Sequence, residues 1–187
     1  MIEEHFAALC TALQRTSSFA PKISGWGREL AAVLDNGGRL LACGNGGSAA
    51  EAQHLTGELV GRFQHERQPL SAIALHADTS AGTAIVNDYG GHELFARQVR
   101  AHGRPGDVLV LLSTSGTSQN VVAAAKTAQE LGVSTWAMTG PMPNPLAALS
   151  DDAIAVEAAT TATVQEVHLA LVHALCAALD EALGIPA

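Results

Sequence analysis

A histidine and a glutamate lie four residues apart just after a glycine-rich turn. In "LLACGNGGSAAEAQHLTGELVGRF", which runs from Leu40 to Phe63, His54 precedes Glu58 by four positions. On a helix, side chains at i and i+4 share one face, and a histidine beside a carboxylate can move protons near neutral pH. The same pair is also an ordinary surface interaction on a helix. Its meaning therefore depends on what the preceding turn holds.

The turn itself is "GNGGS" at 44–48. Glycines let the backbone turn sharply and approach a ligand closely, and a helix that follows supplies free backbone N–H groups. The turn has neither the Gly-Lys-Ser/Thr of a Walker A loop nor the GxGxxG spacing of a dinucleotide fingerprint. By itself it indicates either a structural connection or an anion site.

A second loop, "STSGTSQN" at 113–120, is rich in hydroxyl groups. One serine or threonine at a helix start is an ordinary N-cap, whereas this loop has five around one glycine. Hydroxyls together with the free amides of a helix start form a phosphate cradle. The loop therefore predicts phosphate binding by hydroxyls drawn from Ser113, Thr114, Ser115, Thr117 and Ser118.

The segment "TVQEVHLALVHALCAAL" places polar side chains on an otherwise apolar helix, namely Gln165, Glu166, His168 and His173. A histidine in such a setting is usually a hydrogen-bonded core residue. At about 100° per residue, Glu166 and His173 lie nearly on one face, and Gln165 lies about 80° from His173. Helical geometry alone does not choose among these four groups.

Two further polar side chains, Asn87 and Asp88, occur in "IVNDYG" at 85–90. We expect this segment to be a loop, because Asn, Asp and Gly together are usually a turn signal.

The polar groups described above lie between or after short apolar runs, which alternate along the chain with segments that can form helices. The runs "RLLAC", "LSAIALH", "DVLVLLS", "VSTWAMT" and "DAIAVE" lack inside/outside alternation, as strands covered on both faces do. They predict an α/β fold: a three-layer α/β/α sandwich around a five-stranded parallel sheet. Both polar loops then leave the carboxyl ends of strands, where ligands collect in such sheets.

Helices are predicted at both ends of the chain. Two lie at about 2–16 and 22–36, the second ended by "NGG" at 36–38. A long apolar helix at about 162–183 closes the domain. No linker or repeat is visible, so we expect one domain over residues 1–187, with a helical extension over about 1–36.

Composition limits the classes of partner. The net charge is −8 with ten Lys and Arg, and without a basic cluster the chain is not expected to bind nucleic acid. The sequence shows neither a membrane span nor a signal peptide, which predicts a cytoplasmic protein. Three widely spaced cysteines give no disulfide framework and no CxxC zinc pattern, and we expect reduced, mostly buried thiols.

Taken in order, these motifs resemble those of the sugar isomerase (SIS) domain family, and within it the bacterial phosphoheptose isomerases. The match runs through "CGNGGS", "QHLTGELVGRF", "AIVNDYG", "GDVLVLLSTSGTSQNV", "MTG" and "VQEVHLALVH". The resemblance implies a flavodoxin-like SIS fold and the conversion of sedoheptulose 7-phosphate into D-glycero-D-manno-heptose 7-phosphate through an enediol. It also implies a homotetramer with active sites between subunits, and one zinc ion per subunit.

The resemblance also assigns roles by position. Glu58 would be the base that moves a proton between C1 and C2, and His173 the acid/base on the oxygens. The zinc ligands would be His54, Glu58, Gln165 and His173. The substrate contacts would be Asn45, Gly46, Gly47, Ser48, Glu58, Asn87, Asp88 and Gln165, with the phosphate held by Ser113, Thr114, Ser115 and Ser118.

Two alternatives remain open at this point. One is a non-catalytic SIS protein that binds a replication initiator protein, which "SAAEAQH" and "AIAL" resemble. The other is an isomerase of a different phosphorylated sugar, since Ala49, Ala50 and Glu51, Thr163 and "GPMPNPLAAL" depart from the family's usual residues. The first alternative predicts loss of catalytic groups, whereas Glu58 and His173 are both present.

Overall fold

A five-stranded parallel sheet forms the centre of the structure, a computed structural model that describes residues 1–186. The strand order is β2-β1-β3-β4-β5, which is the doubly wound order of flavodoxin-like folds. The predicted α/β class and the five predicted strands are confirmed. The strands are β1 (Leu40–Cys43), β2 (Ala72–Ala74), β3 (Val108–Ser113), β4 (Ser134–Thr139) and β5 (Asp152–Ala155).

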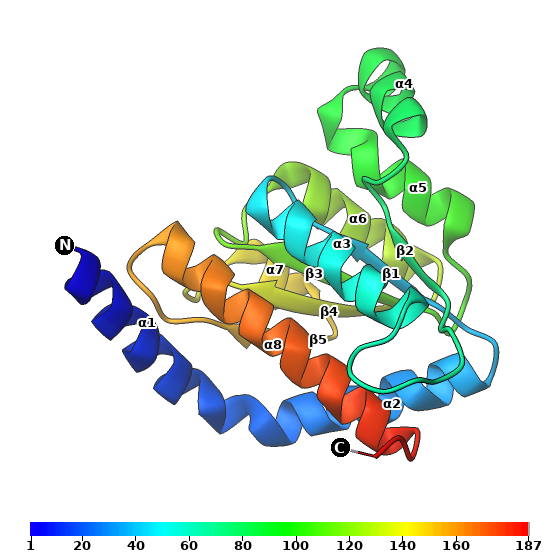
Figure 1. The fold of residues 1–187 in the computed structure, drawn as a ribbon. Helices are drawn as coiled ribbons and strands as arrows, with labels where there is room; N and C mark the ends of the chain where they lie inside the picture. The colour runs from blue at the N-terminus through cyan, green and yellow to red at the C-terminus, as the bar shows by residue number, and fades with distance from the viewer. Residues whose placement is uncertain (187) are drawn as a thin grey trace.

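Helices connect and flank these strands (Figure 1). The two N-terminal helices and the C-terminal helix begin and end within two residues of the predicted positions. Gly37, with φ of 80°, follows the end of the second helix in the left-handed region that favours glycine. The α-helices are α1 (Ile2–Thr16), α2 (Ala20–Asp35), α3 (Gly47–Val60), α4 (Thr79–Tyr89), α5 (Leu94–His102), α6 (Gln119–Glu130), α7 (Pro145–Leu149) and α8 (Thr161–Ala182).

The core lies in two layers, one on each face of the sheet. In β1, Leu40 and Ala42 pack with residues of α2, α3 and α8, while Leu41 and Cys43 pack with residues of α5, α6 and α7. Strand β3 alternates in the same way. Because the inner strands β1, β3 and β4 are covered on both faces, their sequences are largely apolar. The three-layer α/β/α sandwich is therefore present as predicted.

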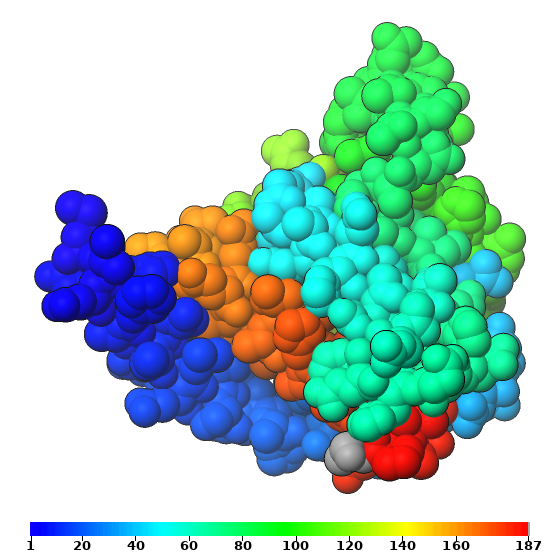
Figure 2. Space-filling view, viewed as in Figure 1, coloured from blue at the N-terminus to red at the C-terminus, as the bar shows by residue number. Residues whose placement is uncertain are grey.

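Helix α4 projects from the body of the domain (Figures 1 and 2). It buries none of its own residues. Asn87 and Asp88 lie in its last turn, so the prediction of a loop at 85–90 was wrong. Asp78 caps the start of the helix by accepting a hydrogen bond from the Ala81 amide, and Gly90 ends it with φ of 87°. These two caps allow a helix across the turn-forming residues.

Helix α8 is long and apolar enough to cross a bilayer by length and composition alone. It instead packs along α2 and α3 on one face of the sheet, with half of its most apolar window buried (Figure 1). This is the environment of an interior helix, and it explains the apolar sequence without a membrane.

The three cysteines are free thiols. Cys43 and Cys176 are buried, as expected, and burial raises the pKa of both thiols. Cys10, on α1, is exposed and is the exception to the expectation of mostly buried thiols.

Candidate active site

The two polar loops meet at the point where the sheet reverses its winding order. β1 and β3 are adjacent parallel strands, so the loops that follow them leave the same edge of the sheet. The side-chain amides of Asn45 and Asn120 join the loops by two reciprocal hydrogen bonds of 2.9 Å. The N-termini of α3 and α6 therefore lie beside each other, and both supply backbone N–H groups for an anion.

The hydroxyl loop is organised by its own hydrogen bonds. Ser113 is buried; its hydroxyl donates to the Ser118 hydroxyl over 3.2 Å and accepts from the Gly116 amide over 3.2 Å. Gly116 has φ of 62°, and a Cβ there would lie 2.1 Å from Asn144 Oδ1. Glycine is therefore required at this turn. Ser115 is exposed, and Thr114 is partly exposed beside it.

Gln165 is held against the glycine loop by close packing. A Cβ on Gly47 would lie 2.5 Å from Gln165 Nε2, so only glycine lets the amide lie this close to the backbone. The first turn of α8 is thereby joined to the start of α3. Ser48 is buried next to this contact, whereas Asn45, Gly46 and Gly47 are exposed at the surface.

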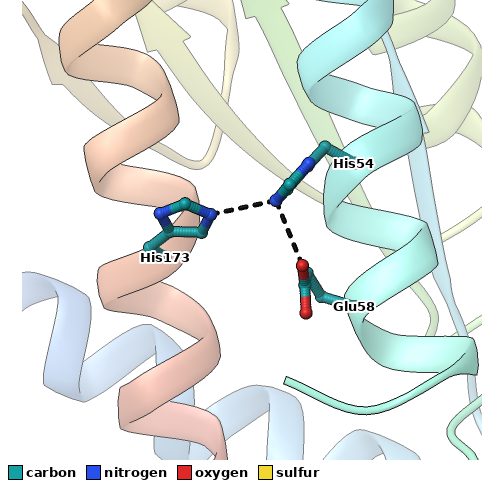
Figure 3. A group of neighbouring side chains, drawn as sticks. All are labelled: His54, Glu58 and His173. Carbon is teal, nitrogen blue, oxygen red and sulfur yellow. Dashed lines mark hydrogen bonds and ion pairs between the residues drawn. The ribbon is translucent and has the colours of Figure 1, made fainter. Parts of the chain in front are cut away.

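Further along the same two helices, His54, Glu58 and His173 converge. His54 Nε2 lies 3.1 Å from Glu58 Oε1 and 2.9 Å from His173 Nε2. Figure 3 shows His54 and Glu58 on α3 facing His173 on α8. Phe63 packs beside them, its ring centroid 5.8 Å from that of His173. The imidazoles and the carboxylate are in reach of one another for proton transfer.

This donor set fits a divalent metal ion. The ligand atoms of His54, Glu58 and His173 lie within 4.8 Å of one another. The Nε2 atoms of His54 and His173 lie 2.9 Å apart and can share only one proton. Without that proton, both nitrogen lone pairs and the Glu58 carboxylate face the same point, where a cation would be held. Two histidines and one glutamate are a ligand set of catalytic zinc sites. The fourth expected ligand, Gln165, is placed only by its contact with Gly47.

A second polar pair is buried beneath the loops. His168 is fully buried and its Nε2 lies 3.1 Å from the Thr139 carbonyl, while its Nδ1 lies 3.9 Å from Glu51 Oε2. Burial raises the pKa of the Glu51 carboxyl to about 7. Burial also lowers the pKa of His168 to about 4, against the opposing effect of the Thr139 carbonyl. Both groups are therefore neutral at pH 5.5.

The structure thus separates the groups that α8 offered. His173 joins the His54–Glu58 pair, Gln165 lies at the glycine loop, and His168 is a core residue. Glu166 accepts a hydrogen bond from His5 of α1 over 2.8 Å. Asn87 and Asp88 are not brought to this cluster, because α4 projects away from α3 and α8 (Figure 1).

Two neighbours of the site were not singled out from the sequence. Asn120 lies in the quoted hydroxyl loop, but an asparagine at a helix start is ordinarily read as a cap. Phe63 lies in "GRF" just beyond α3, and an aromatic residue there suggests only core packing. No sequence signal pairs Asn120 with Asn45, because Asn45 precedes the start of α3 whereas Asn120 lies in the first turn of α6.

The comparisons with known proteins agree with this doubly wound fold. Residues 4–140 match the family model described as the SIS domain. The chain is 63% identical to the phosphoheptose isomerase of Streptomyces coelicolor over 179 residues, which cover 96% of this chain and 78% of that protein. The chain belongs to the SIS domain family and, within it, to the phosphoheptose isomerases.

Solved structures give the same grouping. The phosphoheptose isomerase of Francisella tularensis superposes with a TM-score of 0.91 at 36% identity, over 96% of each chain. That of Neisseria gonorrhoeae gives 0.88 at 43% identity, over 96% of this chain and 97% of the other.

Proposed function

We propose that this chain is the ketose–aldose isomerase that converts D-sedoheptulose 7-phosphate into D-glycero-D-manno-heptose 7-phosphate. The observation that carries the proposal is the convergence of Glu58, His54 and His173 in a member of the phosphoheptose isomerases. The chain acts as a single SIS domain over residues 1–187. A chain that only bound a partner protein would have no need of this acid/base cluster.

Glu58 is the base of the reaction. Its carboxylate removes a proton from C1 of the ketose, giving the enediol, and returns a proton to C2 to give the aldose. His173 moves the proton between the C1 and C2 oxygens. Phe63 beside His173 excludes water from one side of the cluster, which strengthens these interactions.

The phosphate and the sugar are held by the two loops. Ser113, Thr114, Ser115 and Ser118 bind the phosphate, helped by the free amides at the start of α6. Asn45, Gly46, Gly47 and Ser48 contact the sugar, together with Gln165. The Asn45–Asn120 hydrogen bonds support this role, since they fix the glycine loop against the phosphate loop.

Zinc is the metal this site would hold, through His54, Glu58 and His173, with Gln165 as a further ligand. When bound, it supplies a positive charge that stabilises the enediolate oxygens. The support is the fit of two histidines and one glutamate to a catalytic zinc set. Glu58 keeps a second carboxylate oxygen with which to move the proton between the carbons, whereas His173 serves the sugar oxygens when its Nε2 is not a metal ligand.

The active form is a cytoplasmic homotetramer with its sites between subunits. Exposed apolar side chains on two projecting helices support this assembly, among them Ile2 and Phe6 on α1 and Val86 and Tyr89 on α4. In the tetramer, α4 carries Asn87 and Asp88 to the sugar at a subunit boundary. Their exposure in a single chain agrees with that role.

The test is the variant Glu58→Gln, which keeps the side-chain size and removes the base. We expect turnover to fall by at least about 10²-fold, the contribution of a positioned base, while sugar-phosphate binding stays intact by calorimetry. The matched control is Glu66→Gln, at an exposed position on the following loop. If Glu58→Gln is about as active as the control, Glu58 is not the base. The zinc is tested separately, by measuring whether a chelator abolishes the activity of the unaltered protein.

A further inference from the structure

A buried arginine holds the end of the helix that carries Glu58. Arg67 lies in the segment between α3 and β2, and its side chain is 2% exposed. Its Nη2 donates to the Glu58 carbonyl over 2.8 Å, and its Nη1 donates to the Leu59 carbonyl over 2.9 Å. Its Nε donates to Asp180 Oδ1 on α8 over 2.8 Å. One guanidinium thus connects both helices of the candidate active site.

The contacts fall where α3 is weakest. The last four carbonyls of a helix have no partner within it, and the last turn frays unless they are satisfied. Here α3 ends at Val60, so Glu58 lies in its last turn. The Gly61 amide donates to the Gly57 carbonyl over 2.8 Å. Arg67 satisfies the Glu58 carbonyl, and it shares the Leu59 carbonyl with the Leu70 amide, which donates to it over 3.0 Å. A cation at this end also complements the helix dipole.

The link to α8 sets the distance between the two helices. Asp180 lies seven residues after His173, two turns further along α8. The Asp180 side chain is 8% exposed, so both charges of the pair are buried and each requires the other. Arg67 therefore fixes the turn of Glu58 against the helix of His173, whereas a bond to α3 alone would leave that spacing free.

We propose that Arg67, paired with Asp180, is a positioning residue that orders the last turn of α3 so that the Glu58 carboxylate is held opposite His173. Its effect on catalysis rests on the proposed isomerase function; its effect on α3 does not. Lysine cannot replace it, because an ammonium group lacks the planar fork that reaches two carbonyls and a carboxylate together.

The first test is hydrogen exchange at individual amides and needs no turnover. In the unaltered protein we expect the Gly61 amide to exchange within about tenfold of the mid-helix Leu55 amide, since a capped turn does not fray. In Arg67→Lys, Gly61 protection should fall at least tenfold more than Leu55 protection. The matched control Arg62→Lys lies on the same segment, bonds only to the Gln64 carbonyl, and should change neither.

A frayed Gly61 in the unaltered protein overturns the proposal, even if no Arg67 variant folds. So does an equal loss of protection at both amides in Arg67→Lys, because that is the result of a general loss of stability. If the unaltered protein exchanges as expected and yet has no isomerase activity, the proposed function fails and the ordering of α3 stands.

The second test separates catalysis from stability. Arg67→Lys should lower kcat by about 10- to 100-fold, the effect of displacing a catalytic group by about 1 Å, and leave KM close to that of Arg62→Lys. KM should not change, because the phosphate loop lies beside the start of α3, whereas Arg67 contacts its end. Leu109→Ala, in the core on the opposite face of the sheet, is the stability control. An equal kcat loss in Leu109→Ala contradicts a positioning role.

Discussion

Glu51 and His168 make opposite contributions to stability as the pH changes, and removing one should expose the other. Burial raises the pKa of Glu51 from 4.5 to about 7. Its stabilising contribution is full below pH 4.5 and is lost as the pH rises through 7. Burial lowers the pKa of His168 from 6.5 to about 4. Its contribution is full above pH 6.5 and is lost as the pH falls through 4.

The two effects cancel where they overlap. Between pH 4.5 and 6.5, unfolding releases one proton from Glu51 and binds one proton at His168, so the pair adds no net slope. A single titration difference across these two pH units changes the free energy of unfolding by roughly 3 kcal/mol, at 1.36 kcal/mol per unit. As the pH rises from 4.5 to 6.5, the free energy of unfolding of Glu51→Gln should therefore increase by roughly 3 kcal/mol relative to the unaltered protein. That of His168→Gln should decrease by the same amount.

The assay is urea unfolding at fixed protein concentration from pH 4.5 to 6.5, with each variant's free energy of unfolding plotted as its difference from the unaltered protein. The double variant Glu51→Gln with His168→Gln is the control, and its difference curve should be flat. Difference curves of the same sign for the two single variants, or two flat curves, refute the argument that both groups are neutral in the fold.

Three further predictions concern the loops and the core. Gly47→Ala should displace the Gln165 amide, because its Cβ would lie 2.5 Å from Nε2, and we expect kcat to fall about tenfold or more by steady-state kinetics. Ser115→Ala combined with Ser118→Ala should raise KM for the phosphorylated substrate at least tenfold, and an unchanged KM moves the phosphate elsewhere. Leu109→Ala should lower the free energy of unfolding by about 2–5 kcal/mol with KM unchanged.

The sheet was predictable because its signal is local. The inner strands are buried on both faces, so their sequences are mostly apolar, and the five apolar runs correspond to the five strands. The segment around Asn87 and Asp88 was not predictable in this way. Residues that usually form turns lie there within a helix, because Asp78 caps its start and Gly90 ends it, and Asn and Asp are tolerated at an exposed helix end.

The site was predictable where both partners lie on one helix. The spacing of His54 and Glu58 places them together on α3, whatever the rest of the chain does. The choice of His173 among the polar residues of α8 depends on how α8 is rotated about its axis. That rotation is set by the packing of residues such as Val164 and Leu175 into the core, and neither spacing nor composition reveals it.

The most direct test of the account is turnover of sedoheptulose 7-phosphate by the purified protein, followed by chromatography that separates ketose and aldose with mass detection. We predict that the protein forms glycero-manno-heptose 7-phosphate and that Glu58→Gln does not. A protein that binds the sugar phosphate but forms no aldose product contradicts the isomerase assignment.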